Sequence, residues 1–202
     1  LDPRMGGALN AKAWKDLNFL GYDGVSIVGL AAIDNALWDL RGKAAGLNVA
    51  HLIGACRTSV PTYASGGLWL AGSIDDLQKE ARSFVDRGFR AMKTRVGPTD
   101  PERMVARVAA VREAIGPDIG LMVDANQQMS VKQAIRIGRM MEELNLTWFE
   151  EPVIVHDHEG EAEIRAALDT PVASGETVHT HRGIHKILQA GSADVLMPDL
   201  QR

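Results

Sequence analysis

The sequence predicts an α/β fold built from parallel strands, which we interpret as part of a TIM-type barrel. Three observations support this prediction. Beyond residue 60, short apolar or β-rich runs alternate with helical segments, they recur about every 25–30 residues, and most end in polar or charged side chains. A strand followed by a helix, repeated along the chain, is typical of parallel strands joined by right-handed crossovers.

The N-terminal part of the chain has a helical pattern instead. Residues 1–24 begin irregularly and then become helical, and residues 25–46 form a strong helix because apolar side chains recur at helical spacing. Gly46 stands where the cap that ends this helix is expected. A short helical turn follows and closes at Gly54.

Six apolar runs are the predicted strands, and they cover residues 60–65, 89–96, 119–126, 146–152, 171–176 and 193–200. Helices are expected between them. Asp100 and Ser130 are the predicted N-caps of two of these helices, and Pro101 takes a first helical position. Strands this short and apolar are expected where both faces of a sheet are covered.

Two parallel architectures fit this alternation, a doubly wound open sheet and a (β/α)8 barrel. Polar residues at the ends of several strands favour the barrel, because an open sheet concentrates its site at one switch point. Neither GxGxxG nor GxxxxGK[ST] occurs in the sequence. Six strand units are fewer than the eight of a barrel of about 250 residues. We therefore expect about two further units beyond Arg202.

Composition narrows the class of protein. The 202 residues carry a net charge of −4, which gives no reason to expect nucleic acid or an anionic membrane as a partner. No apolar run approaches the roughly 20 residues that span a bilayer. Cys56 is the single cysteine, and it fits a reducing compartment. We expect a cytoplasmic enzyme without a signal peptide, whose true N-terminus precedes Leu1.

Three carboxylates at equivalent strand ends form the candidate metal site. Asp124, Glu150 and Glu176 each close an apolar run, and 26 residues separate each from the next. On one rim of a barrel they would repel each other unless a cation lay between them. Oxygen ligands alone suit Mg²⁺ better than Zn²⁺. The alternative is that each acid caps a helix or pairs with a lysine.

Charged residues on other strand ends extend this candidate site. Lys93 and Arg95 are two residues apart on a predicted strand, so both would face the metal rim. A lysine in such a place can act as a base, or the two cations can simply neutralise the carboxylates. Asp199 follows the sixth run and could orient a histidine, although a helix N-cap is the simpler interpretation.

Other residues have competing interpretations. The pairs His156/His158 and His179/His181 resemble zinc ligands, but a zinc site needs three converging ligands, so solvated or capping histidines are the favoured interpretation. Trp69 could line a pocket or pack in the core.

At this point a family resemblance is visible. The stretches AIDNALWDLRGKAAG, MKTRVG, MVDANQ, WFEEPV, ASGE and MPDLQR resemble the enolase superfamily, and within it the mandelate racemase/muconate lactonizing enzyme family. The resemblance is specific for the superfamily, less so for the mandelate racemase subgroup, and weak for the substrate. It runs in order from about residue 25 to the end.

The resemblance implies a (β/α)7β barrel preceded by an α+β capping domain. Residues 1–55 would be the C-terminal helical part of that capping domain, and 56–202 the first six β/α units of the barrel. It implies Asp124, Glu150 and Glu176 as Mg²⁺ ligands. The remaining roles it implies are catalytic for Lys93, Arg95 and Asp199, the last as part of an Asp–His dyad, and substrate-binding for Ser65 and Asn126.

The chemistry implied is removal of a proton α to a carboxylate, with Mg²⁺ stabilising the enediolate intermediate. Two departures from the family pattern distinguish between the activities that the resemblance allows. The family's Lys-x-Lys motif reads Lys93-Thr94-Arg95 here, and an arginine side chain is a poor base because it gives up its proton far less readily than a lysine does. All six histidines precede Asp199, so the histidine of the dyad is not in this sequence.

The leading hypothesis is a Mg²⁺-dependent acid-sugar dehydratase in which Lys93 and Arg95 bind substrate and stabilise charge. The first alternative is a racemase or epimerase of a 2-hydroxy acid, with Arg95 or Lys93 as a base. The second is an inactive fragment that keeps the fold without a complete site, and we expect this piece alone to be inactive. A zinc hydrolase is a more distant alternative. The expected partners are a small carboxylate substrate and further copies of the chain.

Overall fold

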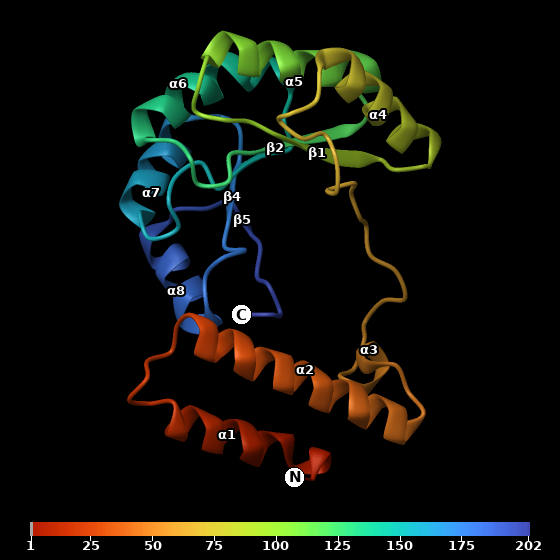
Figure 1. The fold of residues 1–202 in the computed structure, drawn as a ribbon, viewed down its shortest axis with the longest axis vertical. Helices are drawn as coiled ribbons and strands as arrows, with labels where there is room; N and C mark the ends of the chain where they lie inside the picture. Colours follow the sequence, from red (N-terminus) through yellow and green to blue (C-terminus); the bar gives the residue numbers. More distant parts are fainter. Residues whose placement is uncertain (1) are drawn as a thin grey trace. The chain divides into compact units, whose positions relative to one another are not determined.

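The structure is a computed structural model that describes residues 2–202 and divides into two compact units (Figure 1). The first unit holds the residues up to Val60 together with Glu176–Ile184 and Pro198–Arg202. The second unit holds Pro61–Gly175 and His185–Met197. Glu176 and Asp199 therefore fall in the first unit, while the other predicted site residues fall in the second.

The helices lie where the sequence pattern places them. Two short 3-10 helices accompany eight α-helices within residues 2–202; they are η1 (Pro3–Met5), α1 (Gly6–Asp16), α2 (Val25–Ala45), α3 (Val49–Leu52), α4 (Ile74–Asp86), α5 (Pro101–Ile115), α6 (Val131–Met141), η2 (Glu142–Leu144), α7 (His158–Ala167) and α8 (Thr180–Ala190).

Local capping explains several of these boundaries. Gly46 ends α2 in the left-handed conformation, with φ of 66°, which glycine adopts without steric cost. Asp100 caps α5 by accepting a hydrogen bond from the backbone N–H of Arg103. Ser130 and Gln133 form a reciprocal capping box at the start of α6. The three predicted caps are confirmed.

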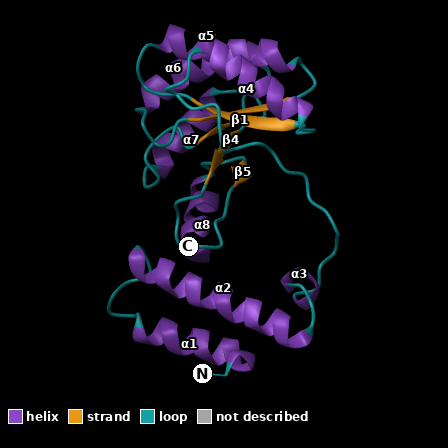
Figure 2. Cartoon of the chain, turned by 45° about the vertical axis from the view of Figure 1, so that its right-hand side comes forward, coloured by secondary structure: helices purple, strands orange, loops and turns teal. Residues whose placement is uncertain are grey.

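The second unit is built on a parallel sheet, which Figure 2 shows in orange with helices beside it. Its strands pair in chain order, β1-β2-β3-β4-β5, and every pairing is parallel. Sequential order is what a barrel requires, whereas a doubly wound sheet reverses its order part-way. The strands are β1 (Ala91–Arg95), β2 (Gly120–Asp124), β3 (Trp148–Glu150), β4 (Val172–Ser174) and β5 (Val195–Leu196).

The prediction of a strand at residues 60–65 is wrong. The structure reduces it to one isolated parallel bridge between Ala64 and Met92. Two hydrogen bonds make this bridge, from Ala64 N to Ala91 O and from Lys93 N to Ala64 O. Pro61 has no N–H to donate, which prevents a longer ladder. Five strands and one bridge thus replace the six predicted strands.

Proline and glycine also shorten the other strands. The 193–200 run gives only Val195–Leu196 because Pro198 cannot continue the pairing. β4 stops before Gly175, whose φ of 122° favours glycine. The other five strands therefore lie where they are predicted, but each is shorter than the predicted run.

The main hydrophobic core belongs to the second unit. β2 is buried on both faces, since Leu121, Met122 and Val123 are all at most 1% exposed. Phe149 of β3 and Ile137 of α6 are fully buried in the same core. Burial on both sides is the arrangement expected of parallel strands.

Helix α2 of the first unit is apolar yet mostly exposed. Ile27 is its only buried hydrophobic side chain within the described residues, while Val25, Ile33 and Leu40 are each more than half exposed. No helix within residues 2–202 has the length and apolar character that crossing a membrane requires.

Candidate active site

Three charged residues form one row across the C-terminal ends of neighbouring strands. Arg95 of β1 is in register with Asp124 of β2, and Asp124 is in register with Glu150 of β3. Residues in register on parallel strands point to the same face. The interval of 26 residues between the two carboxylates in the sequence therefore places them at equivalent positions on neighbouring strands.

Lys93 joins this row from one layer below. Its Nζ atom lies 3.0 Å from Asp124 Oδ2 and also donates a hydrogen bond to Glu150 Oε1. All three side chains are at most 4% exposed. A buried carboxylate pair of this kind requires a positive partner, and here the lysine ammonium supplies it.

Arg95 is the second cation of the row, but its hydrogen bonds are incomplete. Its Nη1 atom lies 3.4 Å from Asp124 Oδ2, and the side chain is only 10% exposed. Nε and Nη1 are buried without a hydrogen-bond partner. The guanidinium carbon sits 5.0 Å from the centre of the Trp69 ring. Nη1 thus has only the ion pair with Asp124, and Nε is a buried donor without a partner.

The pKa values reflect this crowding. Burial raises the pKa of Glu150 to about 7; the negative charge of Asp124 adds to this rise, while hydrogen bonds from Lys93 and Trp148 oppose it. Burial lowers the pKa of Lys93, but the hydrogen bond to Glu150 and the charge of Asp124 outweigh burial and raise it overall.

Neighbouring residues orient both carboxylates. Asn126 donates to Asp124 twice, from its backbone N–H at 2.8 Å and from Nδ2 at 3.2 Å. Trp148 Nε1 donates to Glu150 Oε2 at 3.0 Å. Gln127 Nε2 donates to Glu151 Oε2 at 2.6 Å and so links the segments that follow β2 and β3. Asn126 has φ of 46°, which asparagine tolerates better than most residues.

Three further predicted site residues, Glu176, Asp199 and Ser65, lie outside the row of charged residues. Glu176 is half-buried, two residues beyond β4, and lies in the first unit. Asp199 lies three residues beyond β5 and accepts hydrogen bonds from Gln201 N at 2.9 Å and Arg202 Nε at 3.3 Å. Ser65 is half-buried next to the Ala64 bridge. The functional roles predicted for these three residues stay predictions.

The donor set suits a hard divalent cation. Asp124 and Glu150 offer carboxylate oxygens only, and they already hold the Lys93 ammonium between them. Across residues 2–202, no three His, Cys, Asp or Glu side chains form a cluster able to hold a metal. Asp124 and Glu150, two of the three predicted Mg²⁺ ligands, belong to the second unit, and Glu176 belongs to the first.

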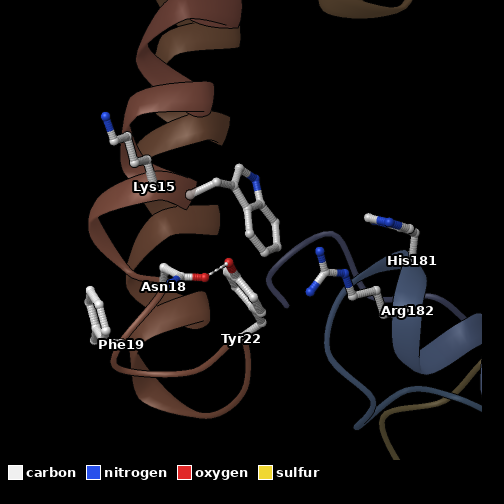
Figure 3. A pocket seen from close by; sticks show the side chains of 7 residues that line it. Lys15, Asn18, Phe19, Tyr22, His181 and Arg182 are labelled. Atoms are coloured by element: carbon white, nitrogen blue, oxygen red, sulfur yellow. Dashed lines mark hydrogen bonds between the residues drawn. The ribbon is translucent and has the colours of Figure 1, made fainter.

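A hollow elsewhere contains none of the predicted site residues. It lies within the first unit and has a volume of about 550 Å³. Trp14 is among the residues that line it, and Figure 3 shows the Tyr22 ring on one side and the Arg182 side chain on the other. The Arg182 guanidinium carbon lies 4.4 Å from the Tyr22 ring centre.

Two site neighbours were not assigned a role from the sequence. Trp148 stands two residues before Glu150 on a strand, so period-two spacing already placed it on the same face. For Trp69, the sequence fits a pocket and the core equally well. Its contact with Arg95 depends on the path of a loop, for which the sequence gives no periodic signal.

Comparison with known families identifies the chain. Residues 76–202 match the family described as enolase C-terminal domain-like, and residues 12–54 match the mandelate racemase/muconate lactonizing enzyme N-terminal domain. The chain belongs to the mandelate racemase/muconate lactonizing enzyme family. The family resemblance found in the sequence is confirmed.

Individual members of this family are similar over most of the chain. An L-talarate/galactarate dehydratase of Salmonella typhimurium is 40% identical over 91% of the chain and 46% of its own length. A D-galactarolactone cycloisomerase of Agrobacterium fabrum is 39% identical over 98% of the chain and 53% of its own length. The chain spans about half the length of these curated relatives.

Solved structures of the family show the same fold. An L-talarate dehydratase from Polaromonas sp. JS666, complexed with Mg and L-glucarate, has a TM-score of 0.93 and 40% identity over 100% of the chain and 57% of its own. A racemase from Streptomyces coelicolor A3(2) with bound magnesium has a TM-score of 0.95 and 36% identity, covering 100% and 56%. The prediction of a partial α/β barrel is confirmed.

Proposed function

We propose that the protein to which this chain belongs is a Mg²⁺-dependent acid-sugar dehydratase. One observation carries the proposal: the row Arg95–Asp124–Glu150, with Lys93 beneath it, places two carboxylates and two cations at adjoining strand ends. The similarity to dehydratases that act on L-talarate and galactarate supports it.

Asp124, Glu150 and Glu176 would hold the Mg²⁺ ion in this proposal. The ion supplies electrostatic stabilisation for negative charge on the substrate carboxylate. The boundary between a capping part (1–55) and a barrel part (56–202), a cytoplasmic location and assembly into homo-oligomers stay predictions alongside it.

The residues of the chain would act on the substrate as follows. Lys93 and Arg95 place positive charge beside the substrate carboxylate, which gains negative charge as its α-proton leaves. Ser65 and Asn126 would contact substrate hydroxyl groups. Asp199 would orient a histidine that removes this proton and returns it to the departing β-hydroxyl. Loss of the α-proton and the β-hydroxyl releases one water, and the resulting enol tautomerises to a 2-keto-3-deoxy acid.

A racemase is the second candidate, since a magnesium-bound racemase is 36% identical to the chain. Racemisation requires a competent base on each face of the α-carbon. Arg95 occupies the second position of the Lys-x-Lys motif, and an arginine side chain is a poor base. This substitution favours dehydration by a single base over racemisation by two.

The test uses the intact protein stripped of metal with EDTA and then supplied with Mg²⁺. We expect at least one acid sugar, such as galactarate, to yield a 2-keto-3-deoxy acid only after Mg²⁺ is restored. In D₂O a racemase would instead exchange deuterium into recovered substrate without forming a keto acid. If no acid sugar in a broad panel gives product, the dehydratase proposal is wrong.

A further inference from the structure

Hydrogen bonds fix the backbone of the loop that precedes α4, although the side chain of Trp69 in this loop is exposed. Leu68 N donates to Glu80 Oε2 at 2.8 Å, and Leu68 O accepts from Thr94 Oγ1 at 3.1 Å and from Arg95 N at 3.3 Å. Leu68 is completely buried and has φ of 54°. A leucine rarely adopts this left-handed conformation, so the surrounding contacts must impose it.

Arg107 fixes the other side of the same loop. Its guanidinium donates to Trp69 O at 3.1 Å and to Gly72 O at 2.7 Å, and Arg107 itself is only 4% exposed. The backbone on both sides of the Trp69 side chain is therefore anchored to helices α4 and α5 and to strand β1.

The Trp69 ring stays open to solvent despite this anchoring. The residue is 56% exposed, and its ring covers the guanidinium of Arg95 at 5.0 Å. Arg95 Nε and Nη1 are buried there without a hydrogen-bond partner. Buried donors without partners cost free energy that a ligand oxygen would recover. An anchored aromatic face thus lies beside Nε, which has no polar partner, and Nη1, which has only the 3.4 Å ion pair with Asp124.

We propose that Trp69 is a specificity-determining residue, which selects sugar acids whose carbon chain is long enough to lie across its indole ring. The inference rests on the proposed function of the site. Arg95 takes a carboxylate oxygen of the substrate through a hydrogen bond from Nε, a charge-assisted contact for a donor that has no partner in the structure. Trp69 covers the C–H face of the carbon chain next to that carboxylate, because an indole ring offers a rigid apolar surface.

This arrangement makes a prediction about chain length. Galactarate is a six-carbon diacid and tartrate is a four-carbon diacid, so both offer a carboxylate to Arg95 but only galactarate extends across the ring. Trp69 should therefore strengthen the binding of galactarate and have little effect on the binding of tartrate. A tryptophan that merely supported Arg95 would affect both acids equally.

The experiment measures equilibrium binding of both acids by calorimetry with Mg²⁺ present, using the intact protein with Asp199→Asn in every variant so that galactarate is not turned over during the titration. Trp69→Ala should weaken galactarate binding about tenfold and tartrate binding by no more than about twofold. Trp69→Phe, which keeps an aromatic face, should restore most of the loss. Arg95→Gln should weaken both acids. Trp38→Ala is the matched control, since Trp38 is also covered by an arginine, Arg41 at 4.6 Å, but lies in the first unit.

Turnover then separates this inference from the proposed function. If galactarate binds and Trp69→Ala weakens it selectively, but no keto acid forms, the inference stands and the dehydratase proposal fails. If Trp69→Ala leaves galactarate binding unchanged, or weakens both acids equally, the inference is overturned. A wild-type protein that binds neither acid overturns the inference, while the dehydratase proposal is then decided by the broader panel of acid sugars. Where turnover occurs, KM for galactarate should rise in Trp69→Ala while kcat changes little.

Discussion

Glu161 is a buried carboxyl group of α7 that lies outside the candidate site. Burial raises its pKa to about 7; Glu151 and Asp157 add to the rise, and the hydroxyl groups of Ser174 and Ser192 oppose it. The folded protein therefore keeps this proton between pH 4.5 and 7, where the unfolded chain releases it. Stability from this group is fully present below pH 4.5 and is lost as pH rises to 7.

The Glu161→Gln variant isolates this effect. Relative to the variant, the wild type should lose about 3 kcal/mol of unfolding free energy between pH 4 and pH 8. Urea unfolding of both proteins at a series of pH values measures this difference. A difference that does not vary with pH would show that Glu161 titrates normally in the folded protein.

Asp124 provides a test of the metal proposal at the same scale. Asp124→Asn keeps the size of the side chain but removes the charge that faces Lys93 and Arg95. We expect Mg²⁺ affinity, measured by calorimetry, to fall at least about tenfold. Glu102→Gln is the matched control, because Glu102 pairs with Arg136 on the surface of the same unit. Unchanged Mg²⁺ binding in Asp124→Asn would remove this residue from the ligand set.

At the scale of elements, the close approach of α6 to the end of α7 depends on Gly138. A methyl group at this position would lie 2.5 Å from Leu168 Cδ1, and both residues are buried. Gly138→Ala should therefore destabilise the protein by about 1–3 kcal/mol. Gly29→Ala in α2 meets no atom within 4 Å and should instead stabilise its helix by about 0.5–1 kcal/mol. Thermal unfolding of both variants measures the contrast, and equal shifts in the same direction would contradict it.

Most elements could be predicted because their signals are local. The caps at Asp100, Ser130 and Gly46 each depend on residues within three or four positions. The prediction of a strand at 60–65 is wrong because it rests on apolar content alone, whereas Pro61 has no N–H to donate to a neighbouring strand.

The candidate site divides in the same way. The row of Arg95, Asp124 and Glu150 follows from equal strand positions, so the sequence was enough to predict it. The contact of Trp69 with Arg95 needs the left-handed turn at Leu68, which long-range hydrogen bonds impose. No local pattern encodes such a turn.

At the scale of the whole molecule, the chain first passes from one unit to the other in the segment between α3 and α4. Residues 53–60 are outside helices and strands, and Arg57 is exposed within them. Proteases cut such segments first. Brief treatment with trypsin should cut after Arg57 before it cuts within any helix or strand, and mass spectrometry of the fragments identifies the site. Arg57→Gln should remove this early cut; a first cut inside α2 or the sheet would contradict the prediction.

The strictly sequential order of the sheet has a consequence for synthesis on the ribosome. Successive strands begin 23 to 29 residues apart, and each pairs with the strand made just before it. At about 5–20 residues per second, each unit emerges over a few seconds, whereas a helix forms in about a microsecond. Each newly made strand therefore meets a finished edge on which to dock. The barrel wall can be laid down in the order in which it is translated, without waiting for a distant part of the chain.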